Sequence, residues 1–431
     1  MESVTTAPTV RLDLGSQDFA WHAHERYAEL RKQSPVHRLL QPNGTEVWLI
    51  TRYRDARAAL SDPRLSKNAQ PVRRALEEAG LVSPVEALET SGPAGHLRLP
   101  TRDLLFSDPP EHTRLRHLVS CALTPRRIER LRLSIEALTK HLLDQMALEE
   151  EIDLLSAFAS PLPITVTCAL LGVPVSDREL IRRWADLLQS TNPEGPLAQL
   201  SMQTFAIYAS ELVRATAGRV RHELAADEQP NLLHALLVVG EDEDRLSEAE
   251  IVDMLIMLLN SGQETTTNLI GNGTLALLRN RDQWDLLQRH PELLPNAVEE
   301  LLRFVGPVER ATFRFSLEPV TIDGVTIPAH RMVGVLIASA DRDPDHFEDP
   351  DRLDLSRPRA QHVAFGHGMH FCLGASLARL EAEVAFGGLL GRFPDLELGC
   401  PVERLAFRTT GYLIRGLRAL PVRPYGRPRV D

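Results

Sequence analysis

The stretch at residues 365–378 reads FGHGMHFCLGASLA and decides the fold class of this 431-residue chain. Its glycines at 366 and 368 permit a tight backbone with positive φ and close approach to a flat group. Directly after Cys372, apolar residues recur at three- and four-residue spacing and predict a helix. The free amides and positive dipole at a helix start lower the pKa of a thiol. We therefore expect a thiolate at Cys372, with Gly374 leaving room for amides to point at the sulfur.

A thiolate in such a loop can serve as a nucleophile, a zinc ligand or a haem ligand, and a purely structural cysteine is the fourth alternative. Zinc needs about four N or S donors, and only His367 and His370 lie near Cys372 in sequence. A cysteine hydrolase needs a histidine held by Asn or Asp, which one sequence does not exclude. The spacing alone leaves all four alternatives open.

A second unusual stretch lies in the longest predicted helix, residues 247–280. Ser247 followed by Glu250 predicts a capping box at its start. Apolar residues on nearly every face predict that this helix runs through the core. Its middle, NSGQETTT at 260–267, places a glycine, an acid and three β-branched hydroxyl residues where a buried helix rarely has them. Such a departure is typical of a functional site, although a polar face packed on a neighbouring helix explains it equally well.

Helical periodicity dominates the rest of the chain, and extended segments are few and short. Helices are predicted at 22–33, 53–60, 112–147, 160–171, 176–190, 199–225, 247–280, 282–289, 293–304 and 373–392. Hairpins are predicted at 36–51 and 320–327, and a buried strand at 332–337. We expect one mainly α domain over residues 1–431 with small β-sheets, in which about 36–51 and 307–337 form a β-rich edge.

Charge and cysteine usage limit the classes of partner and compartment. The formal net charge of −11 argues against nucleic acid or an anionic membrane. The four cysteines are widely spaced, which favours free thiols in a reducing cytoplasm. Residues 1–15 lack the apolar region of a signal peptide, and the longest nearly apolar run, 254–259, is too short to cross a bilayer. We expect a cytoplasmic monomer without a membrane anchor.

Residues 365–378 resemble the haem-binding signature of the cytochrome P-450 superfamily. The resemblance covers nearly the whole chain: it includes a Glu-x-x-Arg helix at 300–303, the following meander at 339–354, a helix that crosses the haem propionates at 108–116, and a Gly-x-acid-Thr kernel at 262–265. So long and specific a match favours haem over zinc or a protease nucleophile. It implies the cytochrome P-450 fold, a triangular prism with a long central helix over the haem and a β-rich edge.

The resemblance implies a haem b whose iron is ligated by the Cys372 thiolate, without thioether bonds because no C-x-x-C-H occurs. Its anionic propionates need paired cations in an apolar interior. The residues implied to contact the haem are His112, Arg116, Arg314, Phe365, Gly366, His370 and Gly374. Without the motif, His112 and Arg116 would be a solvated basic edge. Glu300 and Arg303 are assigned a structural role in a buried network with the meander.

Reduction of dioxygen consumes two protons, and the resemblance assigns their delivery to Glu264 and Thr265. Thr265 would hydrogen-bond the oxygen or its water, and Glu264 would relay protons from solvent, in a helix interrupted at Gly262. Asn260 and Ser261 replace residues that are commonly small and apolar in relatives. Asn260 can donate to and accept from an oxygenated substrate, or it can satisfy the helix backbone.

In the family, two loops contact the substrate. The resemblance places them between Ser66 and Leu105 and near residues 191–202 of this chain. The pocket residues we name are Leu97, Met257, Asn260, Ser261 and Val308. An aromatic content of 5% favours an aliphatic pocket, and GPVERATFRFSLEPV at 306–320 resembles bacterial enzymes that tailor polyketide antibiotics. This implies hydroxylation and/or epoxidation of a macrolide or related polyketide.

Electrons are expected from an external ferredoxin and ferredoxin reductase, because no flavin or nicotinamide fingerprint occurs. The basic cluster Arg126, Arg127 and Arg130 is the predicted ferredoxin contact. Two alternatives remain. One is a haem-thiolate enzyme that uses peroxide or rearranges its substrate, which the Glu264–Thr265 pair argues against. The other is a catalytically silent haem-binding protein, which substrate-dependent NAD(P)H consumption would distinguish.

Overall fold

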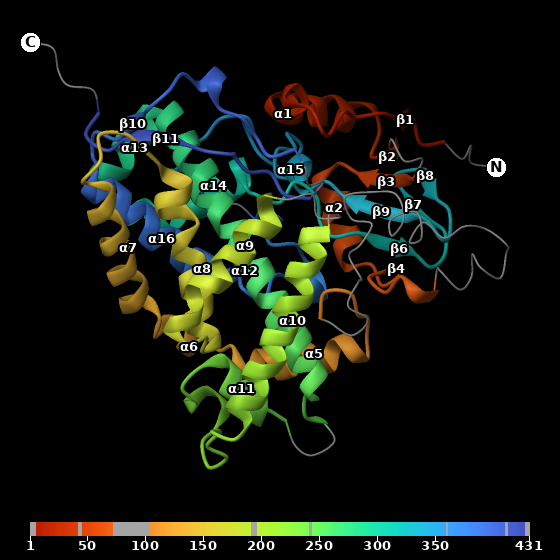
Figure 1. Cartoon of the computed structure of the whole chain (residues 1–431). Coiled ribbons are helices and arrows are strands. Elements are labelled where there is room, and N and C mark those ends of the chain that lie inside the picture. Colours follow the sequence, from red (N-terminus) through yellow and green to blue (C-terminus); the bar gives the residue numbers. More distant parts are fainter. Residues whose placement is uncertain are drawn as a thin grey trace, which may run out of the picture.

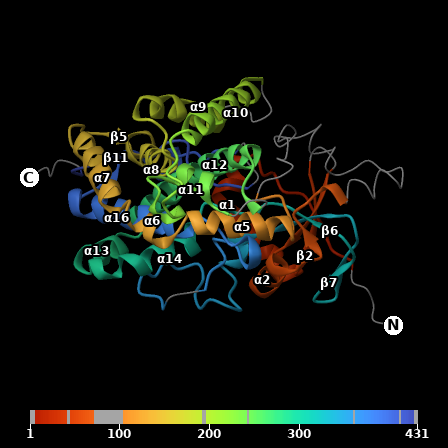
Figure 2. The same ribbon diagram turned by 90° about the horizontal axis from the view of Figure 1, so that it is seen from below.

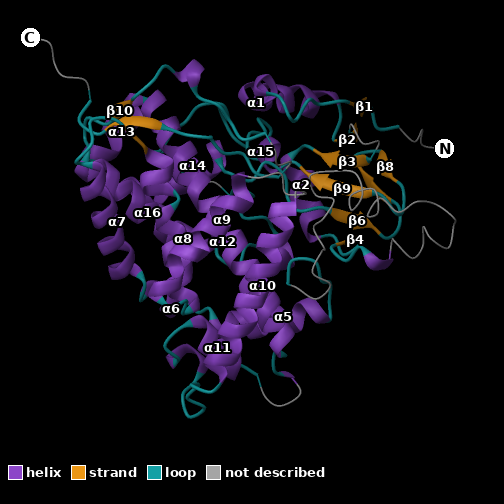
Figure 3. Ribbon diagram, in the orientation of Figure 1, coloured by secondary structure: helices purple, strands orange, loops and turns teal. Residues whose placement is uncertain are grey.

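The computed structural model describes residues 6–41, 45–71, 104–190, 196–240, 244–358, 361–409 and 413–426, with the side chains of 185–190, 196–199 and 202 excepted. Figure 1 shows a triangular outline that narrows toward α11 (Leu232–Val238), and Figure 3 shows the strands gathered mainly at one side of a helical body. The other α-helices are α1 (Gln17–Gln33), α2 (Tyr53–Ser61), α5 (Glu111–Ala122), α6 (Pro125–Glu129), α7 (Arg132–Met146), α8 (Pro161–Leu171), α9 (Arg178–Ser190), α10 (Pro196–Ala217), α12 (Glu248–Arg279), α13 (Arg281–Arg289), α14 (Leu294–Val305), α15 (Ile337–Ala340) and α16 (Ala375–Arg392).

The main sheet joins segments that lie far apart in the chain. The strands are β1 (Thr9–Val10), β2 (Val36–Leu40), β3 (Glu46–Ile50), β4 (Leu65–Ser66), β5 (Ile152–Asp153), β6 (Arg314–Ser316), β7 (Val320–Ile322), β8 (Val325–Ile327), β9 (Met332–Val335), β10 (Glu397–Leu398) and β11 (Pro421–Arg423). Six of them form a sheet in the order β1-β2-β3-β9-β6-β4. Within it β2 and β3 are the predicted antiparallel hairpin, and β3 runs parallel to β9 with Val47 opposite Met332. The β7–β8 hairpin is also confirmed.

Helix α12 runs through the helical body, as its apolar faces predict. It packs against α8, α10, α14 and α16, and Figure 2 shows it lying between α10 on one side and α14 on the other. The predicted capping box is present: the Glu250 amide donates to Ser247 Oγ at 3.3 Å, and Glu250 Oε2 accepts from the Ser247 amide at 2.7 Å. The helix start is therefore fixed by its own side chains.

Two predicted helices differ from the observed ones. Residues 112–147 form α5, α6 and α7, because Pro125 has no amide to continue a helix and Thr124 caps the next one, accepting from the Arg127 amide at 3.2 Å. The predicted helix 199–225 ends at Ala217 and starts earlier, at Pro196. Among the residues that the structure describes, no helix is both long and apolar enough to cross a membrane.

Candidate functional site

The loop before Cys372 has the backbone that its glycines predict. Gly366 and Gly368 have φ values of +75° and +74°, in the left-handed region. A one-turn 3-10 helix follows at Gly368–His370, and the Cys372 amide then donates to the Phe365 carbonyl at 2.9 Å. A Cβ at Gly368 would lie 2.6 Å from Ser61 Oγ, so this glycine also lets the loop pack against α2. The loop is thus held rigidly at both of its ends.

Gly374 lies where α16 begins, and Ala375 is the first helical residue. The Gly374 amide is hydrogen-bonded to Cys372, which matches the prediction that amides point at the sulfur. A Cβ added at Gly374 would meet no atom of the described protein within 4 Å, and the φ of this residue is −84°. Neither crowding by the described protein nor backbone strain therefore requires a glycine here, and the space beside the sulfur is free for a flat group.

The thiol of Cys372 does not have the lowered pKa that its position predicts. Burial raises this pKa above its ordinary value, and the Gly374 amide and the charges of Arg116 and Arg379 oppose the rise without reversing it. The residue nevertheless keeps an exposed surface. The prediction of a lowered pKa was wrong because, for the protein without a bound metal, the desolvating effect of the surrounding residues outweighs the helix start and this exposure. A metal cation bound to the sulfur would supply the missing stabilisation, since it deprotonates a coordinating thiol outright.

The buried His112 packs against the half-buried His370 of the cysteine loop. Their ring centroids are 4.2 Å apart, and each has a buried Nε2 with no hydrogen-bond partner among the described residues. Burial lowers the pKa of both rings, that of His370 to about 3. Both are therefore neutral at physiological pH, and an acceptor lying against them would satisfy these two nitrogens.

Two arginines lie beside the histidine pair, as the resemblance implies. Arg314 is 4% exposed, and its Nη1 donates to the Thr312 carbonyl at 3.2 Å. Burial lowers the pKa of Arg314 to about 10, against the opposing charge of Asp108. Arg116 is half-buried, and its charge acts on Cys372. Neither arginine forms an ion pair within the described ranges, so an added anion would find uncompensated cations here.

Lys67 is a buried cation that sequence reasoning missed. It is 1% exposed, its Nζ donates to Thr312 Oγ1 and to the Phe313 carbonyl at 3.0 Å, and its charge contributes to lowering the pKa of His370. It lies outside every motif of the sequence, and a lysine after a short apolar strand gives no signal of burial. With it, the donors and cations fit the two propionates of a haem.

Glu264 and Thr265 lie in the middle of α12, on a turn that the other described residues cover only in part although the helix crosses the core. Asn260 and Ser261 are exposed, and Glu264 and Thr265 are half-buried. Thr265 Oγ1 donates to the Ser261 carbonyl at 2.8 Å, and Ser261 Oγ donates to the Met257 carbonyl at 2.7 Å. Burial raises the pKa of Glu264, with Arg408 opposing. The turn thus presents a carboxyl that binds its proton more readily and a hydroxyl oxygen that can accept.

The helix is not interrupted at Gly262, contrary to the prediction. Residues Glu248–Arg279 form one continuous helix. A Cβ at Gly262 would lie 3.1 Å from Thr167 Oγ1 of α8, so the glycine permits close helix packing rather than a break. Thr266, one residue after Thr265, is hydrogen-bonded to the buried Glu381 of α16, which places this turn beside the helix that follows Cys372.

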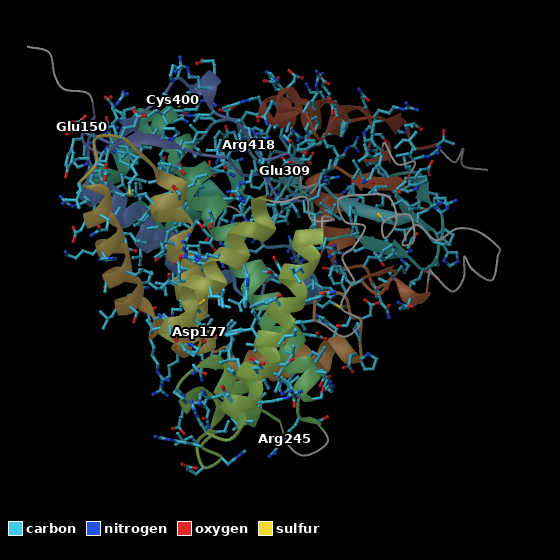
Figure 4. All side chains as sticks on the ribbon, viewed as in Figure 1. Glu150, Asp177, Arg245, Glu309, Cys400 and Arg418 are labelled. Carbon is cyan, nitrogen blue, oxygen red and sulfur yellow. The ribbon has the colours of Figure 1, made fainter. Side chains whose placement is uncertain are left out.

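The predicted substrate pocket is only partly described. Met257 and Val308 are half-buried, and Val308 forms a β-bridge with Ile414. Leu97 and most of the expected contacting loop, residues 72–103, lie outside the described residues, as do 191–195. The neighbour of Val308, Glu309 (labelled in Figure 4), accepts from Tyr27 Oη of α1 at 3.0 Å.

The Glu300–Arg303 pair forms the predicted network with the meander. Arg303 Nε donates to Glu300 Oε2 at 2.7 Å, and Arg303 Nη1 donates to the carbonyls of Asp341 and Pro350 at 3.0 and 2.8 Å. Arg357 also bonds Glu300. Because both members of the pair are buried, removing one charge would leave the other without compensation.

The prediction that Arg127 belongs to a basic surface for ferredoxin docking is wrong. This side chain is 5% exposed and donates to the carbonyls of Ala122 and Gln229 at 2.8 and 3.1 Å, so it holds α5 and α6 against the segment before α11. Arg126 lies 3.6 Å from Asp227, and Arg130 donates to the Asp227 carbonyl at 2.9 Å. Arginine is well suited to donating to several carbonyls. A run of arginines in the sequence does not show whether the side chains make such internal contacts or form a docking surface.

Comparison with known proteins identifies the family of this chain. Among the described residues, no group of three or more His, Cys, Asp or Glu side chains could hold a metal ion. The family described as Cytochrome P450 matches residues 280–399. The chain is 45% identical over 406 residues to Cytochrome P450 107B1 of Saccharopolyspora erythraea, covering 94% of this chain and 96% of the relative. It is 44% identical to Cytochrome P450 monooxygenase PikC of Streptomyces venezuelae, covering 97% of this chain and 95% of the relative.

Solved structures give the same fold. The P450 monooxygenase TamI bound to tirandamycin C has a TM-score of 0.81 and 42% identity, covering 96% of this chain and 99% of that chain. The PksS cytochrome P450 of Bacillus subtilis has a TM-score of 0.84 and 35% identity, covering 96% and 100%. The fold is thus that of the cytochrome P450 enzymes, whose cofactor is a haem ligated by a cysteine thiolate. By the length and level of these matches, the chain belongs to the cytochrome P450 family and is a monooxygenase.

Proposed function

We propose that this monooxygenase inserts one atom of dioxygen into a bulky aliphatic substrate, by hydroxylation and/or epoxidation of a macrolide or related polyketide. The observation that carries the proposal is the polar turn at residues 260–265 of α12, which the protein covers only in part and which lies beside the helix that follows Cys372. The named activities of several relatives support the substrate class. They include the 6-deoxyerythronolide B hydroxylase of Saccharopolyspora erythraea, 40% identical, and the Mycinamicin IV hydroxylase/epoxidase of Micromonospora griseorubida, 39% identical.

Cys372 would hold the haem iron through its thiolate, and the haem, when bound, would supply the activation of oxygen. Arg116 and Arg314 would pair with the propionates, and His112 and His370 would donate to them through their buried Nε2 atoms. Phe365, Gly366 and Gly374 would lie against the haem beside the sulfur, where an added Cβ at either glycine would meet no described atom closer than 3.7 Å.

Glu264 and Thr265 deliver protons. Because Thr265 Oγ1 donates its own proton to the Ser261 carbonyl, its oxygen is available as an acceptor for water in the pocket. Burial raises the pKa of Glu264, so a larger fraction of this carboxyl carries a proton than in an exposed glutamate. Glu264 thus moves protons inward from solvent, and Thr265 positions the water that receives them.

The exposed Asn260 and Ser261 favour a substrate with polar groups, since an amide can both donate and accept. Ser261 Oγ donates to the Met257 carbonyl, so its oxygen can only accept. Asn260 is proposed as the substrate contact because its amide can both donate and accept. Met257, Val308 and Leu97 provide the apolar part of the pocket. Electrons come from a separate ferredoxin and its reductase. Of the three arginines predicted to contact the ferredoxin, Arg126 and Arg130 are still proposed to do so.

A substrate panel tests this proposal. The haem-loaded protein is titrated with macrolactones and linear polyketides, and the shift of the haem spin state is recorded. Fatty acids and a sterol serve as controls of similar apolar area. We expect macrolactones to give the largest shift and, with ferredoxin, reductase and NAD(P)H, products that are heavier by one oxygen. Turnover with hydrogen peroxide alone at the same rate would instead favour the peroxide-using alternative.

A further inference from the structure

Two neighbouring glutamates of α14 bond to different parts of the structure. Glu300 bonds Arg303 and Arg357 of the meander network, whereas Glu299 bonds Arg379 of α16. Arg379 Nε and Nη2 donate to the two carboxylate oxygens of Glu299 at 2.5 and 2.9 Å. This bidentate ion pair is the strongest geometry available to an arginine and a carboxylate. The side chain of Glu299 is only 8% exposed, so solvent screens the pair weakly.

His362 is the third member of this group. The Ala364 amide donates to its Nδ1 at 3.2 Å, so the ring proton is on Nε2, which donates to Glu299 Oε2 at 3.2 Å. His362 thus adds a further hydrogen bond to the carboxylate that Arg379 already holds at both oxygens. Although burial raises the pKa of Glu299, its bonds to His362 and Arg379 lower it to about 2. The carboxylate is consequently charged throughout the physiological range.

The pair is linked to the cysteine loop through Phe365. The Arg379 guanidinium lies 4.6 Å from the centroid of the Phe365 ring, a cation–π contact. The carbonyl of the same Phe365 accepts the Cys372 amide at 2.9 Å. Arg379 is therefore connected to Cys372 through the ring and the backbone carbonyl of one residue, Phe365.

We propose that the Glu299–Arg379 pair sets the electrostatic potential at the Cys372 sulfur and thereby the reduction potential of the haem iron. The proposal rests on the haem-thiolate site described above. A positive charge near a thiolate weakens its donation to the metal and favours the reduced iron, and Glu299 offsets part of that charge. Both are positioning residues, because neither touches the reacting atoms.

The test compares Arg379→Gln with Glu299→Gln in the haem-loaded protein, without any redox partner, by spectroelectrochemical titration. Loss of the arginine charge is expected to lower the reduction potential, and loss of the glutamate charge to raise it. We expect each to change the one-electron equilibrium constant by about threefold or more. A tenfold change would correspond to about 59 mV. The double variant should lie close to the unsubstituted protein, and Arg379→Lys should lie nearer to it than Arg379→Gln.

Arg392→Gln is the matched control, because Arg392 also belongs to α16 but pairs with Asp144 at 3.6 Å on the surface. It should leave the potential unchanged. The proposal would be overturned if the reduction potentials of Arg379→Gln and Glu299→Gln shifted in the same direction, or did not shift. In either case the variants must retain the carbon monoxide band of sulfur-bound haem. If Arg379→Gln does not retain haem, Glu299→Gln decides alone, because the proposal requires a higher reduction potential in that variant. Absence of that band from the unsubstituted protein would instead refute the haem-thiolate site.

Discussion

A change from Gly368 to alanine tests how the cysteine loop is held. The φ of +74° costs an alanine about 1–2 kcal/mol. The added Cβ would also lie 2.6 Å from Ser61 Oγ and 3.1 Å from the Leu60 carbonyl. Because the second atom belongs to the α2 backbone and cannot rotate away, overpacking adds about 1–3 kcal/mol. Gly368→Ala should therefore lose about 2–5 kcal/mol of unfolding free energy.

Gly366→Ala is its matched control. Gly366 has nearly the same φ, +75°, but an added Cβ would find its nearest neighbour among the described residues, the His370 carbonyl, only at 3.7 Å. It should lose only the backbone cost of about 1–2 kcal/mol. Denaturant unfolding of the haem-loaded proteins, followed by circular dichroism, measures both, and Ser61→Ala should rescue part of the Gly368→Ala loss. Equal losses in the two alanine variants would refute the packing argument.

Three further changes give separable outcomes. Thr265→Ala should leave haem binding intact but divert electrons from product to hydrogen peroxide, measured as product and peroxide per NAD(P)H; unchanged coupling would remove Thr265 from proton delivery. Arg314→Gln should release haem several-fold faster to a haem acceptor, because a buried cation for the propionates is lost; an unchanged rate would place the propionates elsewhere. The pKa of Glu299 is lowered from 4.5 to about 2, so its stabilisation is present above pH 4.5 and lost as the pH falls toward 2. Glu299→Gln should flatten that part of the acid-unfolding curve, and an unchanged curve would contradict the assignment.

Much of the fold and the cysteine loop was predictable because each depends on local chemistry. The capping box at Ser247 and Glu250, the β2–β3 hairpin, and the positive φ of Gly366 follow from residues within a few positions of one another. The parallel pairing of β3 with β9 joins segments nearly 300 residues apart, and no local signal specifies it. Only the family resemblance implied that these two segments lie together in a β-rich edge.

The errors have physical reasons in tertiary contacts. The Cys372 pKa was predicted from the helix start, but burial by the loop outweighs that effect. Gly262 was interpreted as a helix break, yet it permits contact with Thr167 of the neighbouring helix. Arg127 was assigned to a docking surface, whereas its guanidinium is buried among carbonyls. Lys67 was missed altogether, because a single lysine shows nothing of its burial in the sequence.

The central claim is that the Cys372 sulfur is the ligand of the haem iron. It is tested most directly by reducing the purified, haem-replete protein and adding carbon monoxide, with Cys372→Ser as the comparison. The account predicts the absorption band diagnostic of sulfur-bound haem in the unsubstituted protein and its loss in the variant. A folded, haem-replete protein without that band, or a variant that retains it, would contradict the account.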